Sequence, residues 1–307
     1  MAGHVGVVGF FVLSGYLLQS SFYRMGENFD VHRFYVLKAK ALLPVYIFSL
    51  VLSAITRLLC IWVPGKVCLL PNGYDFFGLT ISYNVPAWFM GVLFVYIMMA
   101  PMLWCLHRTR WGLPLAFLGA FFLTGYLYWL HRGTSATGLG FPAILCSQPQ
   151  TCMWEFLAGM LACRFCRHFQ WKVSLRTVSA LAVVLATTLL CVLVSDHYAY
   201  ANTLIRNVFL FDVILVTLLT VAIALCADGH GISNARASHV FRQLAALTYP
   251  VYLLHELLYT LLFSNRGLMP DMLPYMIEIM LIVFLSMLLG YLVNLLCSRC
   301  WKLRKTA

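Results

Sequence analysis

The chain has 307 residues, of which 62% are hydrophobic and only 10% are charged. Soluble globular domains carry about 45–50% apolar and about 25% charged residues, so this composition excludes an ordinary soluble enzyme or binding module. The net charge of +11 does not indicate nucleic-acid binding, because such binding needs a basic face on a soluble domain. Basic residues lying beside anionic inner-leaflet lipid account for the charge instead.

Long apolar stretches predict an all-α fold, a single polytopic bundle of about nine transmembrane helices over residues 1–307. A spanning helix needs about 20 apolar residues, and a helix satisfies its own backbone groups where water is absent. No stretch alternates with period two as a strand of a membrane barrel would. The expected spans are 5–22, 41–63, 85–105, 111–131, 151–163 (the shortest), 177–195, 207–227, 243–263 and 274–297.

The basic residues predict the orientation of this bundle. The segments after each successive span hold 4, 1, 2, 1, 4, 1, 2, 1 and 4 Lys and Arg residues. Because basic residues concentrate on the cytoplasmic side, the alternation predicts a multi-pass protein with the N-terminus of this chain outside. The segments predicted to be cytoplasmic are 23–40, 106–110, 164–176, 228–242 and the C-terminal tail.

The first expected span contains Ser14 followed by Gly15. Ser14 is a candidate substrate contact or nucleophile, although Val12 occupies the position two residues earlier where a nucleophile elbow has glycine. A glycine beside a serine in a membrane helix also permits close packing against a second helix. The sequence favours the packing role.

Lys38 and Lys40 precede Pro44 at the start of the second expected span. Two cations at this boundary anchor a helix to lipid headgroups. The alternative is that they bind the phosphates of a cytoplasmic cofactor. The residues alone favour the anchor and leave the cofactor site open.

Ionisable residues within the expected spans are candidates for function, because charge inside a bilayer is costly. Glu155 can pair with Arg57, whereas Asp212 needs a partner or water. For each of these residues the alternative is structural, either an interhelical ion pair or a neutral carboxyl group. The full set is Arg57, Glu155, Asp212, His255, Glu256 and Glu278.

Thr248, Tyr252 and His255 form a polar row in the eighth expected span. Their spacing of four and three residues places them on one helix face, and Pro250 between them frees a backbone carbonyl. An imidazole exchanges protons near neutral pH, so His255 is the candidate general base. The structural alternative is a hydrogen-bonded histidine at a helix interface.

Two cysteine pairs fall at predicted cytoplasmic helix ends, Cys163 with Cys166 and Cys297 with Cys300. Four thiolates are a zinc ligand set, but reduced or acylated thiols at a membrane boundary fit as well. We expect no metal.

Several motifs together resemble acyltransferase family 3, integral membrane proteins that acylate cell-envelope carbohydrates. Gly6 to Leu17 is close to the family pattern GVDxFFxLSGFL, and Thr248 to His255 is very like SYPxYLxH. Three further segments are more loosely similar to family patterns and occur in family order. Residues 38–46 resemble RRxxRxxPxY, residues 86–96 resemble WxLxxExxY, and residues 155–160 resemble EFxxGM.

The resemblance implies an O-acyltransferase of ten helices that moves an acetyl-like group from acyl-CoA to a carbohydrate or similar hydroxyl. It also implies a further helix before residue 1, carrying an arginine and the catalytic histidine, so the domain is expected to be N-terminally incomplete. In this chain His255 is then the candidate base. The residues assigned by the resemblance are Tyr249 and Tyr252 lining the site, Glu155 and Trp88 positioning substrate, and Lys38 and Lys40 binding the phosphates of acyl-CoA.

The chain departs from the family pattern at named positions. Val8 and Leu93 stand where the family has acidic residues, and Lys38 and Lys40 replace arginines. Lysine does not bind phosphate in the bidentate manner of arginine. The alternative function is therefore a catalytically degenerate membrane protein on the same scaffold, with a transport or partner role.

Overall fold

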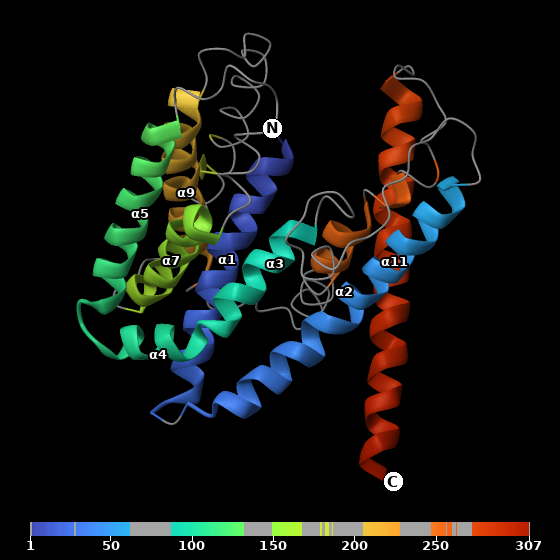
Figure 1. The fold of residues 1–307 in the computed structure, drawn as a ribbon, viewed down its shortest axis with the longest axis horizontal. Helices are drawn as coiled ribbons and strands as arrows, with labels where there is room; N and C mark the ends of the chain where they lie inside the picture. The colour runs from blue at the N-terminus through green and yellow to red at the C-terminus, as the bar shows by residue number, and fades with distance from the viewer. Residues whose placement is uncertain are drawn as a thin grey trace. The chain divides into compact units, whose positions relative to one another are not determined.

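A computed structural model shows the chain as helices joined by turns (Figure 1), with no strand among the residues it describes. These residues are 2–27, 29–61, 87–131, 149–167, 205–227, 247–255, 257–259 and 272–306, with 179, 182, 183, 186 and 262. The labelled helices are α1 (Ala2–Met25), α2 (Val31–Ile61), α3 (Ala87–Met98), α4 (Ala100–Arg108), α5 (Gly112–His131), α7 (Pro149–Cys166), α9 (Ile205–Ala227) and α11 (Met272–Thr306).

The long apolar helices confirm the predicted all-α membrane bundle. Within the described residues, four helices are long and apolar enough to cross a bilayer. A fifth is present if α3 and α4, bent by 54° at their junction, count as one span. Of the nine expected spans, 177–195 lies mostly, and 243–263 partly, outside the described residues.

The chain divides into two compact units. Unit 1 comprises Met1–Val31 and Val92–Ser233, and unit 2 comprises His32–Gly91 and Asn234–Ala307. Each unit has its own apolar core, and each is described on its own.

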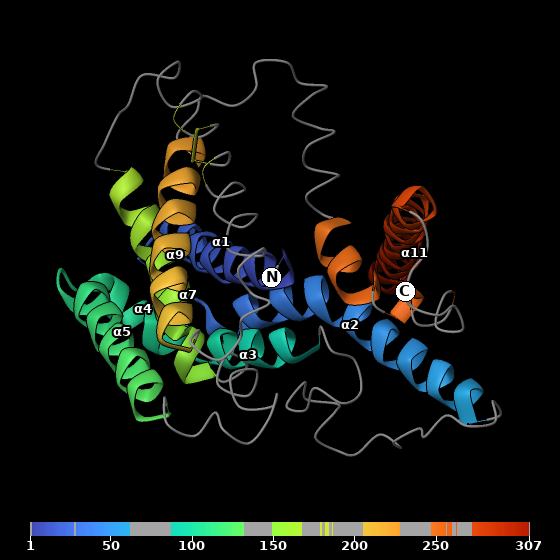
Figure 2. The same ribbon diagram turned by 90° about the horizontal axis from the view of Figure 1, so that it is seen from above.

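Helix α7 is the centre of unit 1, where it packs against α1, α5 and α9 (Figures 1 and 2). Twelve of its 18 residues are buried. The core cluster joins α1, α7 and α9 through Val8, Val12, Trp154, Ala158, Leu215 and Val216. Protein surrounds most of α7, which explains why the stretch predicted at 151–163 is the shortest and least continuous of the apolar runs.

Gly15 on α1 and Gly159 on α7 let these two helices meet backbone to backbone. A Cβ atom at Gly15 would overlap the carbonyl oxygen of Phe156, and one at Gly159 would overlap that of Val12. Small residues permit this close approach between membrane helices. The packing role predicted for the Ser14–Gly15 pair is therefore the one that the structure shows for Gly15.

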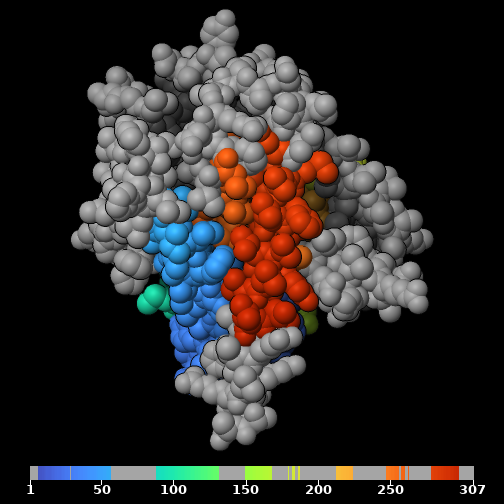
Figure 3. Space-filling model, turned by 90° about the vertical axis from the view of Figure 1, so that its right-hand side faces the viewer, coloured from blue at the N-terminus to red at the C-terminus, as the bar shows by residue number. Residues whose placement is uncertain are grey.

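Unit 2 packs α2, α11 and the helical residues 247–255 and 257–259 around a second core. Leu254, Leu257, Leu258 and Ile282 form its buried cluster, and residues of α2 and α11 pack against it. Figure 3 shows α2 and α11 side by side on one face. Gly290 of α11 lies directly against Pro250, where a Cβ atom would overlap the proline ring.

Two helices of unit 2 extend beyond the apolar stretches that predict them. Helix α2 begins at Val31, within the segment expected to be a cytoplasmic loop, and continues through Pro44. Its first turns include the buried Phe34, which follows the polar residues His32 and Arg33 in the sequence. Helix α11 continues to Thr306, because the basic tail consists largely of residues that favour helix.

Candidate functional site

The helical residues 247–255 carry three of the predicted site residues in unit 2. Tyr249 donates a hydrogen bond from its hydroxyl to the carbonyl oxygen of Leu42, at 3.1 Å. This bond ties the segment to α2, so Tyr249 has a structural contact whatever its role in a site. Thr248 and His255 are exposed, and Tyr252 is half-buried between them along the predicted polar row.

His255 is held by its own helix. Its Nδ1 atom lies 2.7 Å from the carbonyl oxygen of Tyr252 and 3.2 Å from that of Val251. Carbonyl oxygens only accept, so Nδ1 carries the proton and donates it. The remaining ring nitrogen, Nε2, then holds the lone pair that a general base needs. The backbone thus selects one tautomer, as an orienting carboxylate does in other histidine sites.

Aromatic contacts connect Tyr252 to the start of α3. The Phe89 ring meets the Tyr252 ring edge to face, with centroids 5.3 Å apart, and the His255 ring lies 6.1 Å from Tyr252. Trp88, the predicted positioning residue, precedes Phe89 and is half-buried. The structure therefore places Tyr252, His255 and the first turn of α3 in one neighbourhood.

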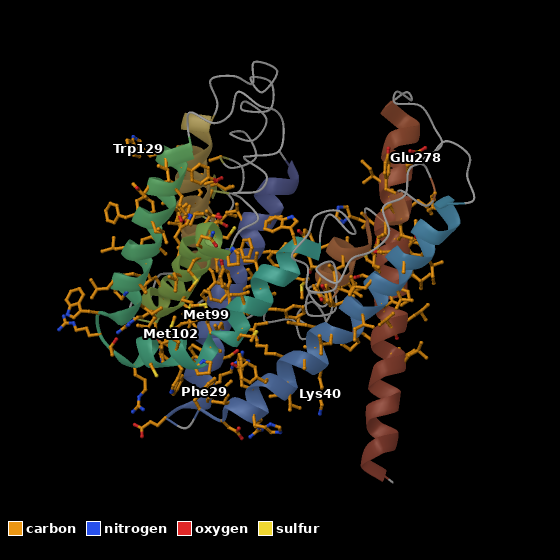
Figure 4. The ribbon with its side chains drawn as sticks, viewed as in Figure 1. Phe29, Lys40, Met99, Met102, Trp129 and Glu278 are labelled. Carbon is orange, nitrogen blue, oxygen red and sulfur yellow. The ribbon has the colours of Figure 1, made fainter. Side chains whose placement is uncertain are left out.

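Lys38 and Lys40 lie in the third turn of α2. Two residues apart on a helix, their side chains leave in directions about 200° apart. Lys38 is half-buried with its ammonium 5.6 Å from the centre of the Phe34 ring, whereas Lys40 is exposed and extends away from α2 (Figure 4). The two cations do not share a helix face.

Glu155 and Ser14 belong to unit 1. Glu155 is only 4% exposed, and its Oε2 atom has no hydrogen-bond partner within the described part of the chain. Asp212 of α9 is also buried and interacts with it electrostatically. Ser14 is half-buried on α1, next to the glycine at the α7 crossing.

Other predicted contacts lie outside what the structure describes. The side chain of Arg57 and residue Glu256 are not described, so the Arg57–Glu155 pair remains a prediction. Glu278 is buried on α11. Cys163 and Cys166 are buried. The described residues include no group of three or more metal-ligating side chains.

A polar pair that the sequence did not predict joins α1 to α4. The Gln19 amide nitrogen lies 2.6 Å from Nδ1 of His107, and Gln19 is fully buried. His107 also touches the rings of Phe22, Tyr23 and Trp104. The sequence feature that indicates this pair is the amide of Gln19 within an apolar stretch. Gln19 carries no charge, so it is not among the ionisable residues considered as candidates for function.

Burial and two cations act on His107, which lies beyond the apolar stretch ending at residue 105. Desolvation, followed by the positive charges of Arg164 and Arg167, lowers the pKa of its imidazole below the usual range. Arg164, in the last turn of α7, donates to the carbonyl oxygen of Thr109, and Arg167, which directly follows α7, lies over the Tyr23 ring. The neutral imidazole is therefore the form that fits this corner of unit 1.

Comparison with known proteins gives one match. A family model described as an acyltransferase domain matches residues 1–295 and runs through both units. Neither a curated protein nor a solved structure matches the chain. The match covers nearly the whole chain and agrees with the apolar helices of the fold. The chain therefore belongs to the acyltransferase 3 family, and its enzyme class is that of a membrane acyltransferase.

Proposed function

We propose that this protein transfers an acetyl-like acyl group from acyl-CoA to a hydroxyl group of a carbohydrate or similar cell-surface acceptor. The family match over residues 1–295 is the observation that carries this proposal. The arrangement around His255 supports it, because an O-acyl transfer needs a base at the acceptor hydroxyl.

The chemistry assigned to His255 is a proton transfer. The acceptor oxygen attacks the thioester carbonyl, the new C–O bond forms, and the C–S bond breaks. Nε2 of His255 takes the hydroxyl proton and returns it to the departing thiolate sulfur, so the reaction balances with free CoA as the second product. The hydrogen bond from Nδ1 to the Tyr252 carbonyl places the proton of the neutral imidazole on Nδ1 and leaves Nε2 as its accepting nitrogen.

The other assignments are ranked by their surroundings. Lys40 is exposed and suits a phosphate of acyl-CoA better than Lys38, whose ammonium lies over Phe34. Tyr252 lies beside His255, Trp88 precedes the Phe89 ring that meets Tyr252, and Tyr249 is tied to α2 through Leu42. Acyl-CoA is proposed as a donor substrate that enters from the cytoplasm, the side on which the basic segments are predicted to lie.

Acyl transfer by vesicles that contain the protein tests the role of His255. We expect His255→Ala to lower turnover by at least about 100-fold, the usual contribution of a general base. His32→Ala removes an exposed imidazole at the start of α2 and is expected to leave turnover unchanged. Equal turnover of His255→Ala and the wild-type protein would remove His255 from the mechanism.

Ser14 and Glu155 are proposed substrate contacts in unit 1 and need a separate test. Glu155→Gln keeps the shape of the side chain and one accepting oxygen but replaces the carboxyl group by an amide that does not ionise. A raised KM for the acceptor with unchanged folding would support substrate binding. An unchanged KM would leave Glu155 with a structural role.

A catalytically degenerate member of the family is the second candidate. Val8 and Leu93, which replace acidic residues of the family pattern, are both buried, at 1% and 8% exposure. Val8 belongs to the core of unit 1. These two positions therefore contribute apolar packing in this chain, which favours a scaffold retained without the full set of polar site residues.

A further inference from the structure

Aromatic side chains pack together at the corner of unit 1 where the ends of α1 and α4 meet. Phe29, in the turn after α1, stacks on Trp104 of α4 with ring centroids 5.2 Å apart (Figure 4). Phe22 of α1 meets the Trp104 ring edge to face, at 5.3 Å. Trp104 in turn lies 5.3 Å from His107, one turn later on α4. These contacts fix His107 against a packed aromatic cluster.

The buried Gln19 orients the imidazole of His107. Its amide nitrogen lies 2.6 Å from Nδ1, so in the neutral ring Nδ1 accepts the hydrogen bond and Nε2 carries the proton. His107 is only half-buried, and Nε2 has no hydrogen-bond partner among the residues that the structure describes. The Nε2–H group is therefore a donor that a ligand can use.

Two guanidinium groups approach this imidazole from the end of α7. Arg164 donates to the carbonyl oxygen of Thr109, two residues after His107, at 3.1 Å. The guanidinium of Arg167 lies 4.0 Å from the centre of the Tyr23 ring, which is itself 4.8 Å from the His107 ring. Desolvation and then these two positive charges lower the pKa of His107. Specific contacts thus hold both cations close to one half-buried ring.

The two cations have no anionic partner within the described part of the chain. Arg164 uses one of its five N–H donors on a backbone carbonyl, and Arg167 contacts a ring. The turn after α1 carries two carboxylates, Glu27 and Asp30, but both are exposed. The charges that act on His107 are those of the arginines. Because two like charges in a region of low dielectric repel each other, a bound anion would stabilise this arrangement.

The charge and the donors of this cluster fit a phosphate monoester. With a neutral imidazole the two guanidiniums supply two positive charges, and a phosphate monoester carries about −1.5 to −2 near neutral pH. Its three terminal oxygens accept several hydrogen bonds, and arginine binds phosphate in a bidentate manner. A phosphodiester or a carboxylate supplies a single negative charge and two oxygens, so either complements the cluster less well.

We propose that His107, Arg164 and Arg167 form a binding site for a phosphate monoester at this corner of unit 1. The two guanidiniums bind the phosphate oxygens, and Nε2 of His107 donates a further hydrogen bond. Gln19 serves either protonation state of the imidazole. Its Oε1 atom has no partner within the described residues, and a half-turn of the amide presents this oxygen to a protonated Nδ1. The site does not include His255, so it is independent of the acyl transfer proposed above.

The emission of Trp104 provides the measurement, because a protonated imidazole quenches an indole that it contacts. The difference in emission between the wild-type protein and Trp104→Phe isolates this indole, and its pH titration in uncharged detergent gives the protonation midpoint of His107. The soluble probe is sulfate, which has the shape and double charge of a phosphate dianion. A bound dianion favours the charged imidazole, so we expect sulfate to raise the midpoint by at least about one pH unit. Sodium chloride at equal ionic strength should leave it nearly unchanged.

Arg164→Gln and Arg167→Gln are the test variants, and Arg108→Gln is the matched control. Arg108 follows His107 on α4 and is exposed, but its charge is not among those that act on the imidazole. Each test variant should start from a higher midpoint, because one cation is gone, and should lose most of the response to sulfate. Arg108→Gln should respond as the wild-type protein does. An equal response in all variants, or a response that chloride reproduces, would overturn the proposal.

Bilayer discs distinguish the two sources of such a phosphate. Discs of phosphatidylcholine with phosphatidate present a monoester headgroup, and discs with phosphatidylglycerol present a diester at matched surface charge. A midpoint that rises further with phosphatidate identifies a lipid ligand. A response to sulfate in detergent, with no difference between the two lipids, identifies a soluble phosphate ester. The absence of both responses would show that the cluster binds no phosphate and would sink the proposal.

Discussion

Gly15 and Gly159 lie where α1 crosses α7, each against the backbone of the other helix. The sequence predicted the close packing at Gly15, since a glycine next to a serine in an apolar stretch favours a close approach between helices. The sequence did not predict the contact between Gln19 and His107, which are 88 residues apart and meet only in the folded chain. Local spacing predicts neighbours on one helix and says nothing of partners on another.

Replacing either crossing glycine by alanine should destabilise unit 1. The added methyl group overlaps a backbone carbonyl that cannot rotate away, so α1 and α7 must separate. We expect Gly15→Ala and Gly159→Ala each to cost about 1–3 kcal/mol, as overpacking usually does. Thermal unfolding of the purified protein in detergent measures the loss.

Gly119→Ala on α5 is the matched control, because nothing lies within 4 Å of the position that its Cβ would occupy. Its melting temperature should equal or exceed that of the wild-type protein, since alanine favours helix over glycine. Equal losses in all three variants would mean that the effect does not arise at the crossing.

His107 should make the stability of the protein sensitive to mild acid. Its pKa is lowered in the folded chain, so the unfolded chain binds the proton more readily. The contribution of His107 to stability is then complete above the ordinary pKa of about 6.5 and decreases as the pH falls through that value. The melting temperature of the wild-type protein should decrease between neutral and mildly acidic pH.

His107→Gln keeps a side-chain partner for Gln19 and removes the titrating group, so its melting temperature should decrease less over the same range. His32→Gln, which removes an exposed histidine, should behave as the wild-type protein does. A decrease in His107→Gln that matches the wild-type protein would assign the acid sensitivity to another group.

Whole helices were predicted well where an apolar run alone defines them and poorly where charges interrupt it. Helix α5 begins one residue after the start of its expected span, 111–131, and ends at the same residue. Helix α2 begins ten residues before its expected span because Phe34 is buried among polar neighbours. The 54° bend between α3 and α4 occurs beside Pro101, which lies near the start of α4 and lacks an N–H group.

Tyr249→Phe tests how the 247–255 segment is attached to α2. The substitution removes the hydroxyl that donates to Leu42 and leaves a carbonyl without this bond. A net loss of about 0.5–1.5 kcal/mol is expected for one neutral hydrogen bond. Thermal unfolding measures it, with Tyr291→Phe on the exposed face of α11 as the control. A Tyr249→Phe protein as stable as the control would show that this hydrogen bond adds nothing.

At the scale of the whole chain, composition predicted the membrane bundle and the motifs predicted the family. Neither predicted that α7 would be the most buried helix of unit 1, because burial depends on which helices surround a segment. For the candidate site, helix periodicity placed Thr248, Tyr252 and His255 on one face. It did not show that a backbone carbonyl fixes the His255 tautomer.

Binding of coenzyme A separates an active transferase from a degenerate family member. A ligand that binds only the folded state raises its stability in proportion to the logarithm of ligand concentration. We expect the melting temperature in detergent to rise with added coenzyme A and not with pantetheine, which lacks the nucleotide phosphates. The absence of any rise with coenzyme A would favour the non-catalytic candidate.

The bend at the end of α3 has a consequence for how unit 1 is built. Because α4 is nine residues long and is bent away from α3 by 54°, it extends for about 13 Å along its own axis in the new direction. Its contacts with α1 and α5 place those two helices on either side of a gap that α7 occupies (Figure 1). Helix α4 thus holds α1 and α5 apart, and α7 fills the space between them instead of facing lipid. The polar residues Thr151 and Glu155 of α7 are therefore buried by protein.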